Sequence, residues 1–250
     1  MANSDNMSNS VESVDDLILA SHGNWRFDKQ VSESFDSHVV KSVPFYEEIQ
    51  RMVVEISEYF IKDNSVIYDI GSSTGTTLSL LSQQHTLKKN INLFGIEESP
   101  SMIENARSRC TSPNVNFLLQ DVISSNICFE NASFVTSILT MQFVPFNYRL
   151  KVLQRIYDGI IGGGAFVLVE KTRCESSFFE VPWLELYWDF KERQGLTDSM
   201  IRQKSKSLRG VLNPLTLQQN MNLLREAGFS NMEIFFRWYN FVGLVAIKEN

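Results

Sequence analysis

The chain has 250 residues, of which 43% are hydrophobic and 21% charged, so it can bury the core of one large α/β domain. Its formal net charge of -6 argues against a broad nucleic-acid-binding surface, and we expect a small-molecule substrate and no direct nucleic-acid partner. Residues 1–13 are polar, which predicts a disordered tail without a signal peptide, and no later segment is apolar enough to span a membrane, so the expected location is the cytoplasm.

Neither the cysteines nor the histidines form a pattern that predicts a site. Cys110, Cys128 and Cys174 stand far apart without a CxxC pair, so neither a disulfide framework nor a metal site is indicated. The three isolated histidines receive no ligand role; they are His22, His38 and His85.

A helical arm precedes the core over residues 14–62. A short helix can begin at 14–19, an aromatic-rich stretch follows at 23–28, and Phe27, Val31 and Phe35 then recur at helical spacing up to the break at Pro44. Residues 46–60 carry a second apolar helical face, and a polar turn at 62–65 leads into the first core strand.

The core alternates between strands and helices. Five apolar segments predict strands, at 66–70, 92–96, 116–120, 132–139 and 165–170. Helical patterns lie between them, at 76–84, 100–110 and 148–159, and a run of glycines at 162–164 predicts a turn before the fifth strand. This alternation indicates a mostly parallel sheet with helices on both faces.

The alternation of strands and helices is interrupted after the fifth strand. Residues 172–213 read as one or two helices inserted over the carboxyl edge of the sheet, as a lid would be. A helix at 216–227 and strands at 232–237 and 241–248 close the chain, the last two as an antiparallel hairpin. This ending resembles the class I S-adenosylmethionine (SAM) methyltransferase fold: Rossmann-like, seven-stranded, with residues 14–250 as a single domain.

The turn after the first strand favours SAM over a dinucleotide, since it reads Asp-x-Gly-x-x-x-Gly instead of GxGxxG. In the resembling fold the turn packs against the methionine part of SAM, so the candidate residues are Asp69, Gly71, Ser72, Ser73 and Gly75. The alternative is that the glycine serves only a tight turn between strand and helix.

Acidic residues follow the next two strands. Glu97, with Glu98 as the second choice, is placed to accept hydrogen bonds from two ribose hydroxyls, although Glu98 can instead stabilise the following helix N-terminus. Asp121 is placed to accept a bond from the adenine amine, although capping of a turn explains it equally well. Three such features at three successive strand ends support one another.

Several longer segments are more specific. They are similar to the carboxy-S-adenosyl-L-methionine (carboxy-SAM) synthase family, and together they extend over nearly the whole chain. The segments are GNWRFDKQVSESF, KSVPFYEEI, DIGSSTG, LTMQFVP, VEK, DFKERQG and NFVGLVAIK. Members convert SAM and prephenate to carboxy-SAM and phenylpyruvate, and the product serves tRNA wobble-uridine modification through a second enzyme. The resemblance also implies a homodimer.

The resemblance assigns roles by position. Tyr46 would touch the cofactor, Gly71 and Ser72 would line its methionine end, and Glu97 would bind ribose. Asp121 and Val122 would flank adenine. This sequence departs from the family at three places, with Glu97 in place of aspartate, Ile138 in place of asparagine, and Ser205 in place of the arginine that grips the carboxylate of carboxy-SAM.

Ser205 decides between two reactions, because serine cannot supply the positive charge that a buried carboxylate needs. If residues 198–209 are helical, Arg202 and Arg209 share its face and can substitute, unless they form only a solvated basic surface. We therefore expect transfer of the methyl group of SAM to a small molecule, with carboxy-SAM synthesis as the alternative. A SAM-binding regulator without turnover is a third class.

No spacing marks a catalytic base. The candidates near the expected mouth of the site are Tyr46, Glu170, Tyr187 and Asp189. In-line displacement at the sulfonium methyl group depends mainly on positioning and desolvation, and a base is needed only if the acceptor must lose a proton.

Overall fold

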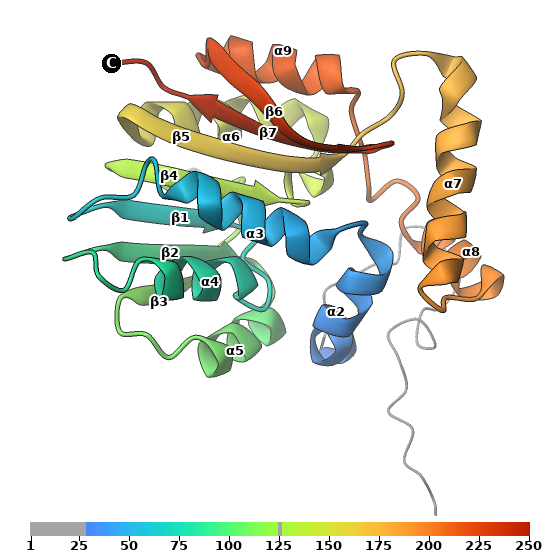
Figure 1. Cartoon of the computed structure of the whole chain (residues 1–250), viewed down its shortest axis with the longest axis horizontal. Coiled ribbons are helices and arrows are strands. Elements are labelled where there is room, and N and C mark those ends of the chain that lie inside the picture. Colours follow the sequence, from blue (N-terminus) through green and yellow to red (C-terminus); the bar gives the residue numbers. More distant parts are fainter. Residues whose placement is uncertain (1–28, 125–126) are drawn as a thin grey trace, which may run out of the picture.

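A computed structural model describes residues 29–124 and 127–250 (Figure 1). One mixed sheet of seven strands runs through it, as expected, and its strand order is β3-β2-β1-β4-β5-β7-β6. β1 to β5 are mutually parallel, and β7 lies antiparallel between β5 and β6. The predicted tail at 1–13, the short helix at 14–19 and the aromatic stretch at 23–28 lie outside the described residues.

The elements follow the predicted order. The strands are β1 Val66–Ile70, β2 Asn92–Glu97, β3 Val115–Leu119, β4 Ala132–Ile138, β5 Ile160–Lys171, β6 Asn231–Trp238 and β7 Phe241–Ile247. The α-helices are α2 Lys29–Ser42, α3 Tyr46–Ser57, α4 Thr76–Gln84, α5 Pro100–Arg109, α6 Phe146–Gly159, α7 Glu180–Arg193, α8 Asp198–Ser207 and α9 Leu217–Ala227. Short 3₁₀ helices span Met141–Phe143 and Ser177–Phe179.

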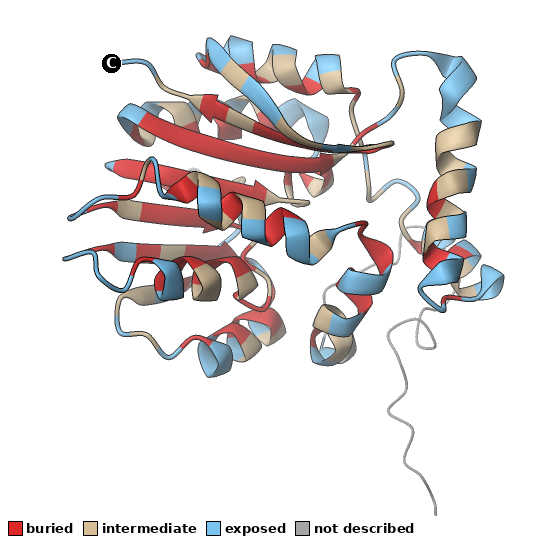
Figure 2. Ribbon diagram, in the orientation of Figure 1, coloured by how far each residue is buried: buried red, intermediate tan, exposed pale blue. Residues whose placement is uncertain are grey.

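Helices cover both faces of the sheet. The apolar sides of α3, α4 and α5 pack on one face, where Ile49, Leu78 and Ile103 are buried. The other face is covered by α6 and α9, through residues such as Ile156 and Leu224. The central strands are buried along most of their length (Figure 2), which explains why they read as apolar runs in the sequence.

Local hydrogen bonds fix where the helices begin. Ser99 Oγ accepts from the backbone N–H of Met102, with Pro100 at the first helical position, so α5 begins where the sequence predicted. Thr216 and Gln219 form a reciprocal capping box at the start of α9. Gly228 ends the same helix with φ 121°, a conformation that favours glycine.

The predicted turn at 162–164 is wrong, because β5 continues through the three glycines. Gly163 N–H donates to Lys248 O at 2.7 Å, and Lys248 N–H donates to Gly164 O at 3.0 Å. Gly163 has φ 76°, and the pairing with β4 shifts register between Ala132 and Phe134. The glycines therefore permit a bulge inside a long strand.

The inserted segment forms two helices, α7 and α8, which stand beyond the carboxyl ends of the parallel strands (Figure 1). Helix α8 ends at Ser207, two residues before the end considered from the sequence. The N–H of Leu208 bonds back to Lys204 O, and Gly210 adopts φ 76°, which turns the chain away. Arg209 is therefore not on the same helix as Ser205.

Candidate functional site

A cavity of about 480 Å³ opens at the carboxyl ends of the parallel strands. Its floor comes from the loops after β1, β2, β3 and β4, and residues of α2, α7 and α8 close over it. The sequence-predicted residues that line it are Tyr46, Asp69, Gly71, Ser72, Ser73, Glu97, Glu98, Asp121, Val122, Ile138, Tyr187, Ser205 and Arg209. Residues from all four strand ends thus meet in one place.

Four candidates do not line the cavity. Gly75 precedes α4, and a Cβ there would lie 3.0 Å from the Phe117 ring and 3.1 Å from Ala106 Cβ, which indicates a packing role. Asp189 is exposed on α7, and Glu170 is buried in β5 without lining the cavity. Arg202 is exposed, with its Nε 2.8 Å from a carboxylate oxygen of Asp198 on its own helix.

The glycine turn has a structural requirement of its own. Gly71 has φ 69°, and a Cβ there would collide with the side chain of Thr140, only 2.8 Å from its Cβ. The N–H groups of Gly71 and Ser72 both donate to Ile96 O, at 2.8 and 3.1 Å. Glycine at 71 is thus demanded by the neighbouring loop, whether or not a ligand is bound.

Glu97 is held rigidly at the cavity wall. Its Oε2 accepts from Ser73 N–H and its Oε1 from Ser99 N–H, each at 2.9 Å. Burial raises the pKa of this carboxyl, while the two backbone donors oppose the shift. Each oxygen keeps further acceptor capacity, so a vicinal diol can bind in front of it.

Asp69 and Tyr46 are two ionisable residues that line the cavity. Burial raises the pKa of Asp69 to about 7, against a hydrogen bond of 2.7 Å that Thr136 donates. Burial likewise raises the pKa of Tyr46 to about 12, and its hydroxyl is hydrogen-bonded to the amide of Gln50. Asp121, by contrast, accepts from Ile123 N–H at 2.8 Å, which is the turn-capping role considered from the sequence.

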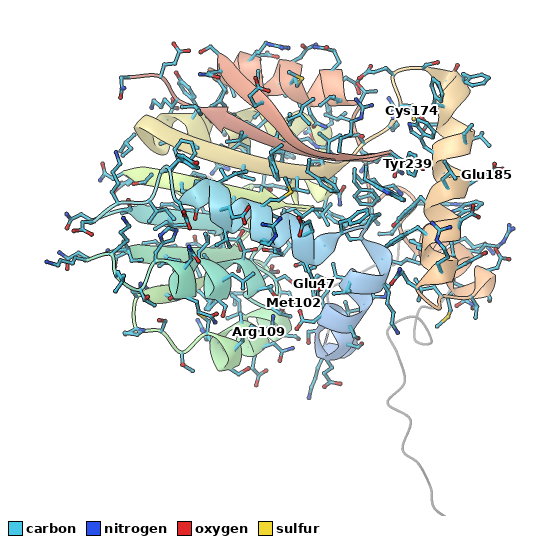
Figure 3. The ribbon with its side chains drawn as sticks, viewed as in Figure 1. Glu47, Met102, Arg109, Cys174, Glu185 and Tyr239 are labelled. Atoms are coloured by element: carbon cyan, nitrogen blue, oxygen red, sulfur yellow. The ribbon has the colours of Figure 1, made fainter. Side chains whose placement is uncertain are left out.

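Helix α2 is tied over the glycine turn by polar contacts. Thr74 Oγ1 donates to Asp36 at 2.6 Å, and Asn105 of α5 donates to the carbonyl of Ser32 at 2.9 Å. Asp36 also pairs with Arg109, whose place on α5 is labelled in Figure 3. These contacts close the cavity on the side of the arm.

Comparison with known proteins decides the family. A family model described as a methyltransferase domain matches residues 67–164. The carboxy-S-adenosyl-L-methionine synthase of Staphylococcus epidermidis is 43% identical over 225 residues, covering 90% of this chain and 97% of that protein. That of Methylococcus capsulatus is 40% identical, covering 89% and 93%. The chain belongs to the carboxy-SAM synthase family.

Solved structures agree on the fold. An O-methyltransferase family protein from Burkholderia thailandensis matches with a TM-score of 0.66 at 14% identity, covering 93% of this chain and 64% of that one. Human N-acetylserotonin methyltransferase in complex with SAM matches with a TM-score of 0.60 at 14% identity, covering 88% and 55%. The expected Rossmann-like methyltransferase fold is confirmed.

The cavity fits the cofactor of this family. Ser72 Oγ is buried beside the glycine turn with no hydrogen-bond partner among the described residues, as a donor or acceptor awaiting a ligand would be. The acceptor Glu97 and the apolar Val122 lie on the same wall, which suits ribose and adenine. The protein is a SAM-dependent transferase, and SAM or its carboxylated form is the cofactor that matches its family.

The lysines of this cavity were not predicted from the sequence. Lys171, Lys191 and Lys204 all line it, as does His38, which had received no ligand role. Lys204 Nζ is hydrogen-bonded to His38 Nε2 and lies 3.5 Å from Ser42 Oγ, which joins α8 to α2. Lys171 ends a strand, the same signal that marked Glu97, whereas the two lid lysines carry no distinguishing spacing.

Among the described residues, no group of three or more His, Cys, Asp or Glu side chains could hold a metal ion. Over the same ranges, the helices lack the length and apolarity needed to cross a bilayer.

Proposed function

We propose that the protein is a carboxy-SAM synthase, which converts SAM and prephenate to carboxy-SAM and phenylpyruvate and so supplies tRNA wobble-uridine modification by a second enzyme. Relatives named for this activity match about 90% of the chain, lid included. This is the alternative from the sequence, and it fits the relatives' names better than plain methyl transfer.

The observation that carries the proposal is the charge around Ser205. Lys204 and Arg209 line the cavity together with this serine. A carboxylate enclosed in a protein is stable only with a cation or several donors beside it. Positive charge therefore remains where the family has its arginine, although the side chain at 205 is neutral.

The reaction balances without an outside base. The sulfonium of SAM makes the protons of its methyl group more acidic. Prephenate would become aromatic by losing carbon dioxide and hydroxide. The hydroxide would take one methyl proton and leave as water, and the carbon dioxide would bond to the methyl carbon. Tyr46 and Tyr187 fit this scheme, because burial raises the pKa of both phenols and keeps them protonated at neutral pH. Their part is then to shape the cavity and exclude water.

Methyl transfer to a small acceptor stays as the second candidate. Ser205 and Ile138 both remove a polar group that the family places near the cofactor. A methyl donor site has no need of either group, since a neutral acceptor requires only positioning.

Mass spectrometry of the cofactor separates the two. After incubation with SAM and prephenate, we expect the cofactor to gain the mass of one carbon dioxide and phenylpyruvate to appear. Ser205→Arg, which restores the family's residue, is the matched control and should retain the activity. Demethylated cofactor with a labelled acceptor would instead favour methyl transfer, and calorimetric SAM binding without any turnover would favour a regulator.

We also propose that residues 14–250 form one cytoplasmic domain with residues 172–213 as its lid, acting on small molecules without binding nucleic acid directly. The single continuous sheet and the net charge of -6 support this.

A homodimer is part of the same proposal. An aromatic band joins the start of α7 to the tip of the β6–β7 hairpin, where Tyr239 points toward α7 (Figure 3). Neighbouring rings in it lie 4.4–6.5 Å apart. Its members are Phe45, Phe178, Phe179, Trp183, Phe236, Trp238 and Tyr239. Phe178 is 75% exposed and Phe45 55%, so the band offers an apolar surface to a second copy.

A further inference from the structure

We propose that Lys171 and Lys191, whose Nζ atoms each lie close to the ring of Tyr187 inside the cavity, form a subsite for the carboxylate of a ligand that binds beside the sulfonium. We call these three residues the paired-lysine subsite. The inference rests on the proposed synthase function, and it names a binding element separate from the charge around Ser205.

The geometry of the subsite is fixed by one buried ring. Lys171 Nζ and Lys191 Nζ each lie 4.5 Å from the centroid of Tyr187. The Tyr187 hydroxyl donates to the carbonyl of Ser42 at 2.8 Å, and the ring packs on Phe241 with centroids 5.2 Å apart. Since the two lysines come from β5 and α7 and the carbonyl from α2, three elements hold the charges in place.

Both lysines are placed where positive charge is costly. Lys191 is 6% exposed, and burial lowers the pKa of Lys171 to about 8, with Glu180 as the opposing charge. The two nitrogens lie within twice 4.5 Å of each other, so they repel across a poorly solvated space. An anion beside them offsets both the cost of burying their charge and their mutual repulsion.

The sign of the charge selects the ligand class. A sulfonium carries a positive charge itself. Two ammonium groups lining the same cavity therefore weaken its binding unless an anion binds near them. Both partners in the proposed reaction provide carboxylates: prephenate has two and phenylpyruvate one, and carboxy-SAM has one next to its sulfonium besides that of its methionine part. The subsite is therefore assigned to a carboxylate, and binding measurements distinguish the source.

The test measures phenylpyruvate affinity by calorimetry with the demethylated cofactor, S-adenosylhomocysteine, at saturation. We expect Lys171→Met and Lys191→Met each to weaken phenylpyruvate binding by about 10- to 100-fold, as loss of a charged hydrogen bond does. Lys191→Arg should keep most of the affinity. Lys206→Met, which removes an exposed lysine of α8, is the matched control and should bind as the parent does.

Carboxy-SAM and methyl phenylpyruvate complete the design. If the two methionine variants lose affinity for carboxy-SAM and not for phenylpyruvate, the carboxylate is that of the cofactor, and the subsite stands. Unchanged binding of both anions overturns the inference, as does an equal loss for the uncharged methyl ester. If a methionine variant fails to fold, Lys→Gln and Lys→Arg at the same position give the same comparison.

These readouts are independent of turnover. If no carboxy-SAM is formed from prephenate but the charge-dependent loss of phenylpyruvate affinity persists, the synthase proposal fails and the carboxylate subsite remains.

Discussion

At the scale of single residues, Asp69 couples folding to pH. Its pKa is about 7 in the folded protein because the carboxyl is buried, against about 4 in an unfolded chain. Between these values the folded state binds more protons than the unfolded state, so its stability falls as pH rises from about 4 to about 7 and then levels off. The ionised form therefore costs up to about 4 kcal/mol above pH 7.

We expect Asp69→Asn to remove that cost, because the amide oxygen still accepts the hydrogen bond from Thr136. Without cofactor, the variant should gain up to about 4 kcal/mol over the parent at pH 8 and little at pH 4.5. Urea unfolding at both pH values measures the difference. A gain that is the same at both would show that ionisation is not the cause.

Alanine substitutions at Gly71 and Gly195 distinguish the energetic cost of backbone strain from the cost of a steric collision. Both have positive φ, 69° and 88°, but nothing lies within 4 Å of a Cβ added at Gly195. Gly195→Ala should cost about 1–2 kcal/mol of unfolding free energy, the strain alone. Gly71→Ala should cost about 1–3 kcal/mol more because of Thr140.

The cost of the collision is tested by introducing Gly71→Ala into the Thr140→Gly variant and comparing its unfolding free energy with that of Thr140→Gly alone. The excess cost should fall to the level of Gly195→Ala. If it does not, the collision with Thr140 is not what excludes a side chain at 71.

At the scale of elements, Arg149 of α6 organises the cavity floor and the end of the lid. It is 2% exposed, and it donates to the carbonyls of Val144, Gln142 and Asn213 at 2.8, 3.0 and 2.7 Å. Its charge also opposes the effect of burial, which raises the pKa of Glu170 well above its usual value. One side chain thus joins the loop after β4 to the segment after α8.

Arg149→Met should lower the unfolding free energy by about 3–5 kcal/mol, since it removes three buried hydrogen bonds from a charged donor and the positive charge that acts on Glu170. Adding Glu170→Gln should recover part of the loss. Arg225→Met on α9 removes an exposed arginine that donates to Asn222 on its own helix, and should change stability by less than about 0.5 kcal/mol. A loss below about 1 kcal/mol for Arg149→Met would contradict this account.

The core elements could be predicted from the sequence because their periodicity reports burial directly. β1 and α4 have the predicted bounds, and the acidic residue expected after β2 meets the glycine turn as the parallel topology requires. The prediction of a turn at the three glycines in β5 was wrong because glycine permits a bulge as readily as a turn. The lid lysines could not be found, since helical spacing does not say which face of α7 or α8 meets the cavity.

At the scale of the whole molecule, the aromatic band predicts how the chain assembles. Its rings run from α7 across the β6–β7 hairpin to Phe45, which precedes α3 and is held at φ 56° with its side chain outward. Because Tyr187 and Lys191 lie on the same helix as part of the band, a second copy seated there would also brace the lid. We therefore expect dimerisation to stabilise the closed cavity.

We expect the parent to be a dimer in sedimentation equilibrium at micromolar concentration, and the double variant Phe45→Asp/Phe178→Asp to be a monomer, because two buried charges oppose association. Leu87→Asp is the matched control, since Leu87 is 94% exposed and not part of the band, and it should remain dimeric. A parent that is monomeric at all concentrations contradicts the dimer, and a dimeric double variant places the interface elsewhere. If the dimer braces the lid, the monomeric variant should also bind phenylpyruvate more weakly, while its thermal midpoint shows that it is folded.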